Sequence, residues 1–571
     1  MVNNDLEGLR VIKKELEQAV LICSDRCLYQ STKWAAEILD GIHPDALDHE
    51  EHFTHIAENM QNMLPLYEST LPPQSEVEYN KYQYAKALFQ MRQYDNAAFI
   101  LSKFDTPKSR FLRLYSKYLA GEKRKEEETQ DILSTSEEML AENAELDSIY
   151  AELSVASRNK ELDAFCMYLY GIVLRKRGEE EEAARVLLDS VKAYEFNWSA
   201  WMELGQIVKT KKAFHDLRKV LDQILPQSLV KDAFLAYVAL EVYLPQEQFW
   251  PLLDRLKYYF PNSVYVKSQI ATAHYDLRDY PHAEAIFEEI RAENPYRLED
   301  MDKYSNLIYV QERSDKHMKL SILAHQCERI DKYRPETCCI IGNYYSAIRN
   351  VAESIAYFRR ALKLNRNYHL AWTLLGHDYI ELKNPNAAIE CYRRAINVNT
   401  RDYRAWYGIG QAYEILNLQQ YGLYYYLKAT ELRPYDARMW SAVADCLKSQ
   451  NRDNERIAYY LRAASFDFPD RHKVYERLGK ELDGMEKRDD AAFFYRLAYD
   501  VYVEEGTPAE DYAEVALYLA EYHADKCQWR EAERFARNLM ENGVGTRQEE
   551  AKALVEDIRI RAARLGHPVP D

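Results

Sequence analysis

The sequence predicts an all-α protein in which pairs of antiparallel helices repeat along the chain and stack into a superhelix. Trp372, Trp406 and Trp440 follow one another at a spacing of 34 residues, and AWTLLGHDY (371–379) returns in similar form as AWYGIGQAY (405–413). Gly (17) and Pro (18) are scarce among the 571 residues, which disfavours a turn-rich β fold. A fixed period of this length is typical of stacked helix pairs, because one pair cannot bury its apolar faces alone.

Residues at fixed positions inside this period match the motif of the tetratricopeptide repeat. That motif has a large residue at position 4, Leu-Gly at 7 and 8, Tyr at 11, small or aromatic residues at 20, 24 and 27, and often Pro near 32. The unit that starts at His369 supplies Trp372, Leu375-Gly376, Tyr379, Ala388, Tyr392 and Ala395, and the next supplies Trp406, Ile409-Gly410, Tyr413, Tyr426, Ala429 and Pro434. Small residues let two helices approach closely, and aromatic rings fill the space between units. We therefore expect a right-handed superhelical solenoid of roughly 12 to 14 helix-turn-helix repeats.

The repeat pattern and its interruptions divide the chain into five segments. They are 1–43 (N-terminal helices), 44–80 (a loop insertion), 81–270 (an N-terminal repeat array), 271–543 (a C-terminal superhelix) and 544–571 (a capping helix and tail). Pro44, Pro65, Pro72 and Pro73 mark the insertion. Thr546 and Glu549 have the spacing of a capping box, so we expect a helix that reaches about Leu565 and covers the last repeat.

Charge and composition limit the classes of partner. The net charge of −17 argues against nucleic acid or an anionic membrane as the main partner, because both favour a cationic protein surface. No apolar run is long enough to cross a bilayer, and the N-terminus does not read as a signal peptide. Nine cysteines without a Cys-x-x-Cys pair favour a reducing intracellular compartment. Of the adjacent Cys338 and Cys339, we expect one to face the core and one the groove.

The sequence carries no signature of catalysis or cofactor binding. It has no Gly-rich phosphate loop, no dinucleotide fingerprint and no nucleophile elbow. His49, His52 and His55 lie in the suspected loop and lack the His-Glu-x-x-His order of zinc enzymes, so a solvated polar turn explains them more simply than a metal site. His377 has no nucleophile or acid placed for it. We therefore expect no enzyme, no metal site and no cofactor.

The groove of such a superhelix is the candidate binding surface. The first helix of each pair lines the concave side, mainly with positions 2, 5, 9 and 12, of which the last three share one stripe. We expect a peptide-binding set that mixes amides, aromatic rings and carboxylates and that prefers a peptide with an arginine and an aliphatic anchor. Its candidate members are Asn343, His377, Asp378, Tyr407, Gln411, Glu414 and Asp445, with Asp378 on the flank of the groove.

Several longer stretches resemble the family of anaphase-promoting complex subunit 8, the cell division cycle protein 23 type. They go beyond the generic repeat positions and include ENPYRLEDMDKYSNLIYV (293–310), IDKYRPETCCIIGNYYS (330–346), AWTLLGHDY and RDYRAWYGIGQAYEIL (401–416). Weaker likeness appears in KWAAEIL (33–39), RFLRLYSKYLAGEK (110–123), LYGIVLRK (169–176) and TRQEEAKALV (546–555). The resemblance thus spans nearly the whole chain.

The resemblance implies a non-catalytic scaffold of a multisubunit ubiquitin ligase that acts in the cell cycle, in the nucleus and cytoplasm. It implies a homodimer formed through the N-terminal repeats, here roughly 1–270, contacts with other subunits of the complex, and a C-terminal groove that receives the C box. The C box is a basic Arg-Ile/Tyr-Pro-Arg-like motif of the coactivators, and it suits the acidic and amide residues named above.

Two other interpretations stay open on the residues. A free-standing tetratricopeptide adaptor or co-chaperone would bind acidic peptide tails as a monomer, although the dense Lys/Asn set that such tails require is missing. A metal hydrolase built on His49, His52 and His55 is the more distant alternative. Mass in solution separates a dimer from a monomer, and a zinc assay tests the hydrolase.

Overall fold

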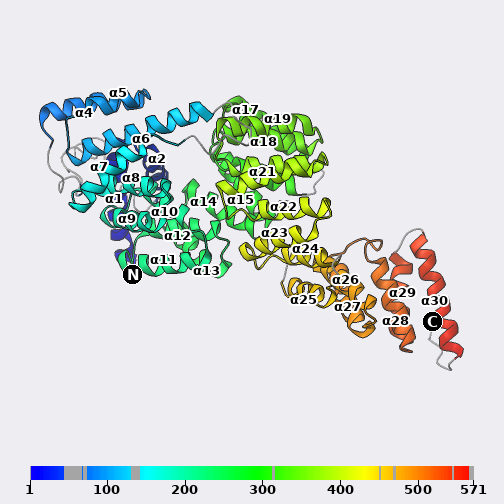
Figure 1. Cartoon of the computed structure of the whole chain (residues 1–571). Helices are drawn as coiled ribbons and strands as arrows, with labels where there is room; N and C mark the ends of the chain where they lie inside the picture. Colours follow the sequence, from blue (N-terminus) through cyan, green and yellow to red (C-terminus); the bar gives the residue numbers. More distant parts are fainter. Residues whose placement is uncertain are drawn as a thin grey trace. The chain divides into compact units, whose positions relative to one another are not determined.

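The computed structural model of the chain describes residues 2–43, 67, 74–129, 142–311, 315–448, 452–466, 471–542 and 546–564. Over these residues the regular structure is helical, with no strand (Figure 1). The contacts group the chain into two units, 1–367 and 368–571. The boundary expected at residue 270 is of another kind. It separates the repeats expected to form a homodimer from those expected to bind a peptide, whereas the boundary at residue 367 separates two groups of contacts.

The first unit contains the N-terminal helices and the longer part of the repeat array. Its helices are α1 (Val2–Asp25), α2 (Tyr29–Asp40), α4 (Glu76–Gln90), α5 (Tyr94–Ile100), α6 (Pro107–Thr129), α7 (Leu146–Arg158), α8 (Ala164–Lys176), α9 (Glu180–Ala193), α10 (Trp198–Ile207), α11 (Lys211–Ile224), α12 (Leu229–Glu241), α13 (Gln246–Tyr259), α14 (Val264–Asp276), α15 (Tyr280–Glu293), α16 (Met301–Val310), α17 (Lys316–Ile330), α18 (Pro335–Ala347) and α19 (Val351–Leu364).

The second unit continues the alternation of helices. Its members are α20 (His369–Glu381), α21 (Pro385–Val398), α22 (Tyr403–Ile415), α23 (Gln419–Leu432), α24 (Ala437–Leu447), α25 (Asp453–Ala464), α26 (Arg471–Gly484), α27 (Arg488–Glu504), α28 (Ala513–Asp525), α29 (Trp529–Asn542) and α30 (Thr546–Arg564). Consecutive helices pack as pairs, as in α20 with α21 and α22 with α23. The predicted all-α repeat fold is confirmed.

Glycine and aromatic residues hold the two helices of a pair together, as the repeat motif predicts. The ring of Tyr392 on α21 lies so close to Gly376 on α20 that a Cβ at residue 376 would meet Cε1 of the ring at 2.4 Å. Gly410 approaches the ring of Tyr426 in the same way, at 2.6 Å from Cδ1. A side chain larger than hydrogen at these positions would push the helices apart, so the glycine sets the spacing within a repeat.

The helices α4 and α30 test the expected bounds of the insertion and the expected capping helix. Helix α4 begins at Glu76, where the Ser75 side chain accepts a hydrogen bond from the backbone N–H of Glu78, so the end of the expected insertion at residue 80 is wrong. His49, His52 and His55 lie outside the described residues. At the C-terminus, α30 packs on α29 as the expected capping helix, and the buried side chains of Ala551, Val555 and Ile558 belong to the same core.

Helix α2 packs on helices that are far away in sequence. Trp34 stacks on Trp198 of α10 with ring centroids 4.2 Å apart, and Tyr265 of α14 meets Trp34 edge-on. The Ser31 hydroxyl lies 2.8 Å from the hydroxyl of Ser199, also on α10. Helix α2 therefore contacts both α10 and α14 and covers part of each (Figure 1).

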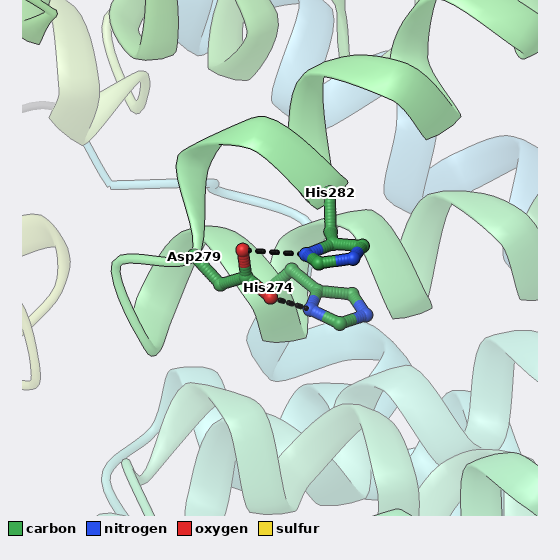
Figure 2. Close-up of side chains that lie close together, drawn as sticks. All are labelled: His274, Asp279 and His282. Carbon is green, nitrogen blue, oxygen red and sulfur yellow. Dashed lines mark hydrogen bonds and ion pairs between the residues drawn. The ribbon is translucent and has the colours of Figure 1, made fainter.

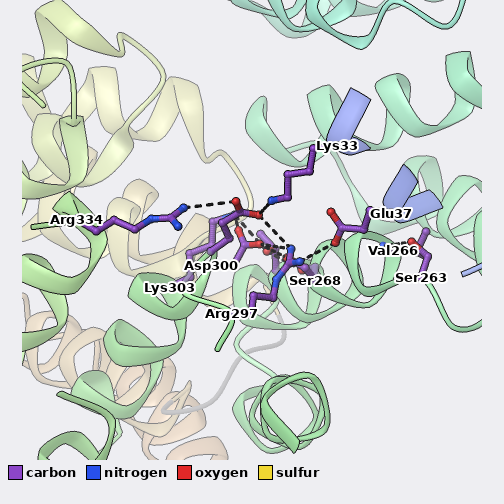
Figure 3. Close-up of polar contacts among 11 residues, drawn as sticks. Lys33, Glu37, Ser263, Val266, Ser268, Arg297, Asp300, Lys303 and Arg334 are labelled. Carbon is purple, nitrogen blue, oxygen red and sulfur yellow. Dashed lines mark hydrogen bonds and ion pairs between the residues drawn. The ribbon is translucent and has the colours of Figure 1, made fainter. Parts of the chain in front are cut away.

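An ionic cluster links α2 to the segment between α15 and α16. Arg297 donates from Nη1 to Oε1 of Glu37 at 2.7 Å, and Lys33 pairs with Glu299 (Figure 3). Arg334, at the start of α18, pairs with the other oxygen of Glu299 at 3.4 Å. The side chains of Arg297 and Glu37 are only 11% and 16% exposed, so this pair is shielded from solvent far more than an ordinary surface ion pair.

Among the helices that the structure describes, none combines the length and the apolar character needed to cross a bilayer.

Candidate peptide-binding surface

The first helices of three successive pairs carry most of the predicted binding residues. His377 lies on α20, Tyr407, Gln411 and Glu414 lie on α22, and Asp445 lies on α24. Helix α20 contacts α22. Helix α23 contacts both α22 and α24, so it connects these two helices. We call this set of five residues the C-terminal polar surface. The two other predicted members, Asn343 and Asp378, are described separately because the structure buries them.

A buried tyrosine on the second helix of each pair supports one polar residue of this surface. Tyr392, Tyr426 and Tyr460 follow one another at the repeat spacing of 34 residues and are at most 2% exposed. Their hydroxyls reach, in the same order, Nδ1 of His377 at 2.8 Å, Oε2 of Glu414 at 2.7 Å, and Oδ1 of Asp445. Burial raises the pKa of all three phenols well above the ordinary value, so the hydroxyls stay protonated and can donate.

Glu414 is the exposed carboxylate of the surface. Its side chain is exposed, and its Oε2 accepts a hydrogen bond from the hydroxyl of Tyr426. Tyr407 lies beside it, half-buried, with its ring 5.3 Å from that of Tyr426. Burial raises the pKa of Tyr407, and the nearby carboxylates of Glu414 and Asp445 raise it further. Tyrosine and carboxylate together offer a flat apolar face and a negative charge, a combination that fits a guanidinium group.

Asp445 is already engaged by one arginine of the chain. Nη1 of Arg477, on α26, donates to Oδ2 of Asp445 at 2.6 Å, while the hydroxyl of Tyr460 donates to Oδ1. The side chains of Arg477 and Asp445 are 54% and 38% exposed, so this ion pair is open to water and to exchange with another cation.

His377 presents an uncharged ring. Part of its side chain is exposed. The protein atoms around the ring nevertheless desolvate the imidazole and lower its pKa to about 4. The charge of Asp402 tends to raise this pKa, and the charge of Arg404 tends to lower it. A ring with this pKa is neutral at pH 7 and offers one hydrogen-bond donor and one acceptor. Its Nδ1 faces the hydroxyl of Tyr392, and this contact fixes the orientation of the ring.

Asn343 and Asp378 do not have the exposed positions expected of groove residues. Each is only 2% exposed. The side-chain amide of Asn343, in the first unit, donates to Oγ of Ser305 and to Oδ1 of Asn306, both at 2.8 Å, because the helices α16 and α18 pack side by side over it. Both protons of this amide are thus used inside the protein, and a binding role for Asn343 stays a prediction.

Two further expectations about exposure need correction. Cys338 and Cys339 are both fully buried, so neither faces a groove. Position 5 of the motif, expected on the concave surface, is buried in three repeats, since Thr373 and Ser441 are 1% and 6% exposed and Cys339 is 0% exposed. The first helices of neighbouring repeats pack closely enough to cover this position. The spacing of residues along a single helix does not predict that packing.

The hydroxyls that support the surface were missed by reasoning from the sequence alone. Tyr392, Tyr426 and Tyr460 occupy position 24 of the repeat, where an aromatic residue is expected for packing between helices, so the motif alone gives no sign of a polar role. The signal that distinguishes them is the choice of tyrosine over phenylalanine at all three positions, whereas the preceding repeat has Phe358. Arg477 was missed as well, because it does not fall on position 2, 5, 9 or 12 of its repeat, where groove residues were expected.

Family comparisons match the N-terminal half and the central repeats. The family described as anaphase promoting complex subunit 8 / Cdc23 matches residues 11–271. Two tetratricopeptide-repeat families match residues 335–368 and 373–437. The second of these ranges contains four of the five residues of the C-terminal polar surface, so that surface is built on tetratricopeptide repeats.

Three curated relatives show the extent of the similarity. The chain is 37% identical over 382 residues to anaphase-promoting complex subunit 8 of Arabidopsis thaliana, a match that covers 64% of each chain. It is 38% identical over 332 residues to the cell division cycle protein 23 homolog of Homo sapiens, covering 57% of this chain and 51% of that protein. It is 31% identical over 438 residues to anaphase-promoting complex subunit CDC23 of Saccharomyces cerevisiae, covering 64% and 68%. The matches therefore span from about half to about two thirds of these relatives.

Proposed function

This chain belongs to the anaphase-promoting complex subunit 8 / Cdc23 family, and we propose that it is a non-catalytic scaffold subunit of that ubiquitin ligase. In this role it binds the C-box segment of a coactivator through the C-terminal polar surface and supports ubiquitination without contributing catalytic groups. Its partners are a second copy of the chain, the other subunits of the complex and the coactivator. Its sites of action are the nucleus and cytoplasm, which imaging of a tagged chain tests.

The observation that carries the proposal is the pair of supported carboxylates. Glu414 and Asp445 are each held by a buried tyrosine hydroxyl, so their orientation is fixed before a ligand arrives. Carboxylates that are positioned in advance bind a guanidinium group at a smaller entropic cost than mobile ones. The C box contains two arginines, and the two carboxylates lie in consecutive repeats.

The packing of α2 supports the choice of the C-terminal repeats. In the first unit, α2 covers part of α10 and α14, and its ionic contacts add to this apolar packing. A peptide would have to displace Trp34 from its stack on Trp198 to reach this face.

The experiment is fluorescence anisotropy with a labelled peptide that contains an Arg-Tyr-Pro-Arg core, titrated with the full chain at low and moderate salt. We expect Glu414→Gln to weaken binding about tenfold, equivalent to about 1.4 kcal/mol, because one charge-assisted contact is lost. Tyr426→Phe removes only the supporting hydroxyl, and we expect a smaller loss of affinity of the same sign. Higher salt weakens binding to the native chain.

The control is Glu431→Gln, which removes an equal charge from an exposed site on α23, where Glu431 pairs with Lys428 at 2.8 Å. This variant retains the affinity of the native chain. If the two glutamate variants weaken binding equally, the effect comes from net charge and the proposed surface is wrong. If Ala in place of either peptide arginine does not change the affinity, the C-box proposal fails.

Mass in solution distinguishes the proposed subunit from a free-standing adaptor. We expect sedimentation equilibrium to give about twice the chain mass of 67.3 kDa at micromolar concentration. A monomer at every concentration, together with preference for an acidic peptide tail over the C-box peptide, would favour the adaptor or co-chaperone.

A further inference from the structure

Three potential metal ligands meet at the turn between α14 and α15. His274 lies in the last turn of α14, Asp279 precedes α15, and His282 lies in the first turn of α15 (Figure 2). Nδ1 of His274 lies 2.9 Å from Oδ2 of Asp279, and Nδ1 of His282 lies 2.7 Å from Oδ1 of the same carboxylate. One ligand atom of each side chain lies within 4.8 Å of the other two.

The backbone of this turn is tightly constrained. The N–H of Leu277 donates to the carbonyl of Ala273 at 3.0 Å, and the N–H of Asp279 donates to the carbonyl of His274 at 2.9 Å. Arg278 has a positive φ of 62°, the left-handed conformation that ends many helices. The three side chains are thus fixed on one short turn, and His274 also packs edge-on against the ring of Trp250 at 5.1 Å.

Among the described residues, this turn combines two histidines with a carboxylate, and the equivalent turns of other repeats do not. The hydrogen bond from Asp279 to His274 corresponds to those from Asn350 to Tyr345, from Asn384 to Tyr379 and from Leu418 to Tyr413. The position of His274 is therefore tyrosine in three other repeats, as the motif requires at position 11. At His523 of α28 the position is again histidine, and its Nδ1 lies 2.6 Å from Oε1 of Gln528, the residue that corresponds to Asp279. The turn between α14 and α15 differs because a carboxylate takes the place of that amide and a second histidine, His282, also reaches it.

The Asp279 carboxylate is also turned away from its ordinary role. Asp279 occupies the N-cap position of α15, where an aspartate side chain usually accepts a hydrogen bond from the first turn of the helix. Here it makes no such bond, and each of its oxygens faces an imidazole instead. At the N-cap of α21, by contrast, the Asn384 side chain accepts from the N–H of Ala387.

We propose that His274, Asp279 and His282 form a zinc site, with the two Nδ1 atoms and one carboxylate oxygen as ligands and water completing the coordination. Two imidazoles and one carboxylate are ligands that Zn²⁺ prefers, at about 2.0–2.2 Å. The three ligand atoms now lie within 4.8 Å of one another, and in a tetrahedral site they would lie about 3.3 Å apart, so the side chains need to draw closer together around the ion. In each ring the proton on Nδ1 moves to Nε2, so both imidazoles stay neutral.

Bound zinc would link the end of α14 to the start of α15. The His282 side chain is 73% exposed, so the site opens to solvent and the ion can enter without unfolding. Because the metal binds only the folded turn, it stabilises this repeat. This site is separate from the C-terminal polar surface, and its test does not involve the peptide.

The test is isothermal titration of ZnCl₂ into the full chain after removal of metal with a chelator. We expect His282→Ala to remove one equivalent of zinc binding or to weaken it at least about tenfold, and Asp279→Asn to weaken it in the same direction. His325→Ala, a matched exposed histidine on α17 outside the cluster, leaves binding unchanged. Circular dichroism checks that each variant is folded.

Absorption at the zinc edge on the native chain identifies the ligands. The site is supported if the zinc has only nitrogen and oxygen neighbours in the native chain. This signal should disappear in His282→Ala, together with the one equivalent of bound zinc. Sulfur neighbours would assign the metal to the cysteines and overturn the proposal. Equal zinc stoichiometry and affinity in the native chain and His282→Ala would overturn it as well, because the ion would then lie elsewhere, for example at His49, His52 and His55.

Discussion

The ring of Tyr392 connects packing to the binding surface at the scale of one residue. It lies between Gly376 of its own repeat and Gly408 of the next, where an added Cβ would meet the ring at 2.4 Å and 2.5 Å respectively. Its hydroxyl reaches His377, which the repeat places one residue after Gly376. A change that moves the ring therefore affects both the distance between helices and the orientation of the histidine.

Gly376→Ala should destabilise the second unit. Its methyl group would overlap the ring of Tyr392, and overpacking of this kind costs about 1–3 kcal/mol. Urea unfolding followed by circular dichroism measures the change. Gly484→Ala is the control, because a Cβ at this residue near the end of α26 meets nothing within 4 Å. We expect the control to be neutral or slightly stabilising, since alanine reduces the freedom of the unfolded chain.

Single residues also show where reasoning from the sequence ends. The period of 34 residues predicted the glycine and aromatic positions, since these follow from the packing inside one repeat. It predicted Asn343 as an exposed residue, whereas the contact between α16 and α18 buries it. The position of a residue on its helix determines the direction in which its side chain points. Whether that side chain is exposed depends on how closely the next helix packs. The binding roles of the seven predicted residues stay predictions.

At the scale of elements, α2 is the helix whose position owes most to distant residues. Its contacts reach α10, α14 and the segment before α16, more than 160 residues away along the chain in the case of Ser31 and Ser199. The sequence predicted helices over 1–43 from their spacing of apolar residues. It could not predict where α2 packs, because neither the repeat period nor a local motif links Lys33 and Glu37 to Glu299 and Arg297.

Arg297→Gln should loosen α2. The substitution removes the shielded contact with Glu37 and the longer contacts with Glu299 and Asp300, at 3.6 Å and 3.7 Å. Hydrogen bonds to charged groups contribute about 1.5–3 kcal/mol, so the exchange of amide hydrogens in 29–40 should accelerate about tenfold or more. Mass spectrometry of that peptide measures it. Arg329→Gln, on an exposed face of α17, serves as the control and should leave exchange in 29–40 unchanged.

The same cluster should give the first unit a sensitivity to acid. Burial tends to raise the pKa of Glu299, but the hydrogen bond and charge of Lys33, with Arg297 and Arg334, outweigh it and hold the pKa below its ordinary value. A depressed pKa contributes stability above the unfolded value of about 4.3, and that stability is lost as pH falls through the folded value. Free energies of unfolding measured between pH 5 and pH 3 should therefore fall less steeply in Glu299→Gln than in the native chain. Parallel curves would show that Glu299 does not contribute.

At the scale of the whole molecule, the chain should unfold in more than one step. In a repeat protein each pair of helices contacts mainly its neighbours, so stability is a sum of local terms and long arrays lose cooperativity. The contacts of this chain group into 1–367 and 368–571, each with its own buried clusters, such as the one around Trp201 and the one around Tyr495. The repeat pattern predicted an extended array but not this division, because the motif continues across residue 368 in the same period.

Two substitutions placed in different units test this division. Gly376→Ala should lower the urea midpoint of the peptides from α20 to α23 and leave those from α8 to α14 unchanged, because its clash with Tyr392 lies entirely in the second unit. Arg297→Gln should do the reverse, since its partners all lie in the first unit. Hydrogen exchange at a series of urea concentrations, read peptide by peptide, reports both midpoints in one sample. If each substitution shifts the urea midpoint of every peptide equally, the array unfolds cooperatively as one unit. A single free energy of unfolding for the whole chain would then replace the sum of local free energies.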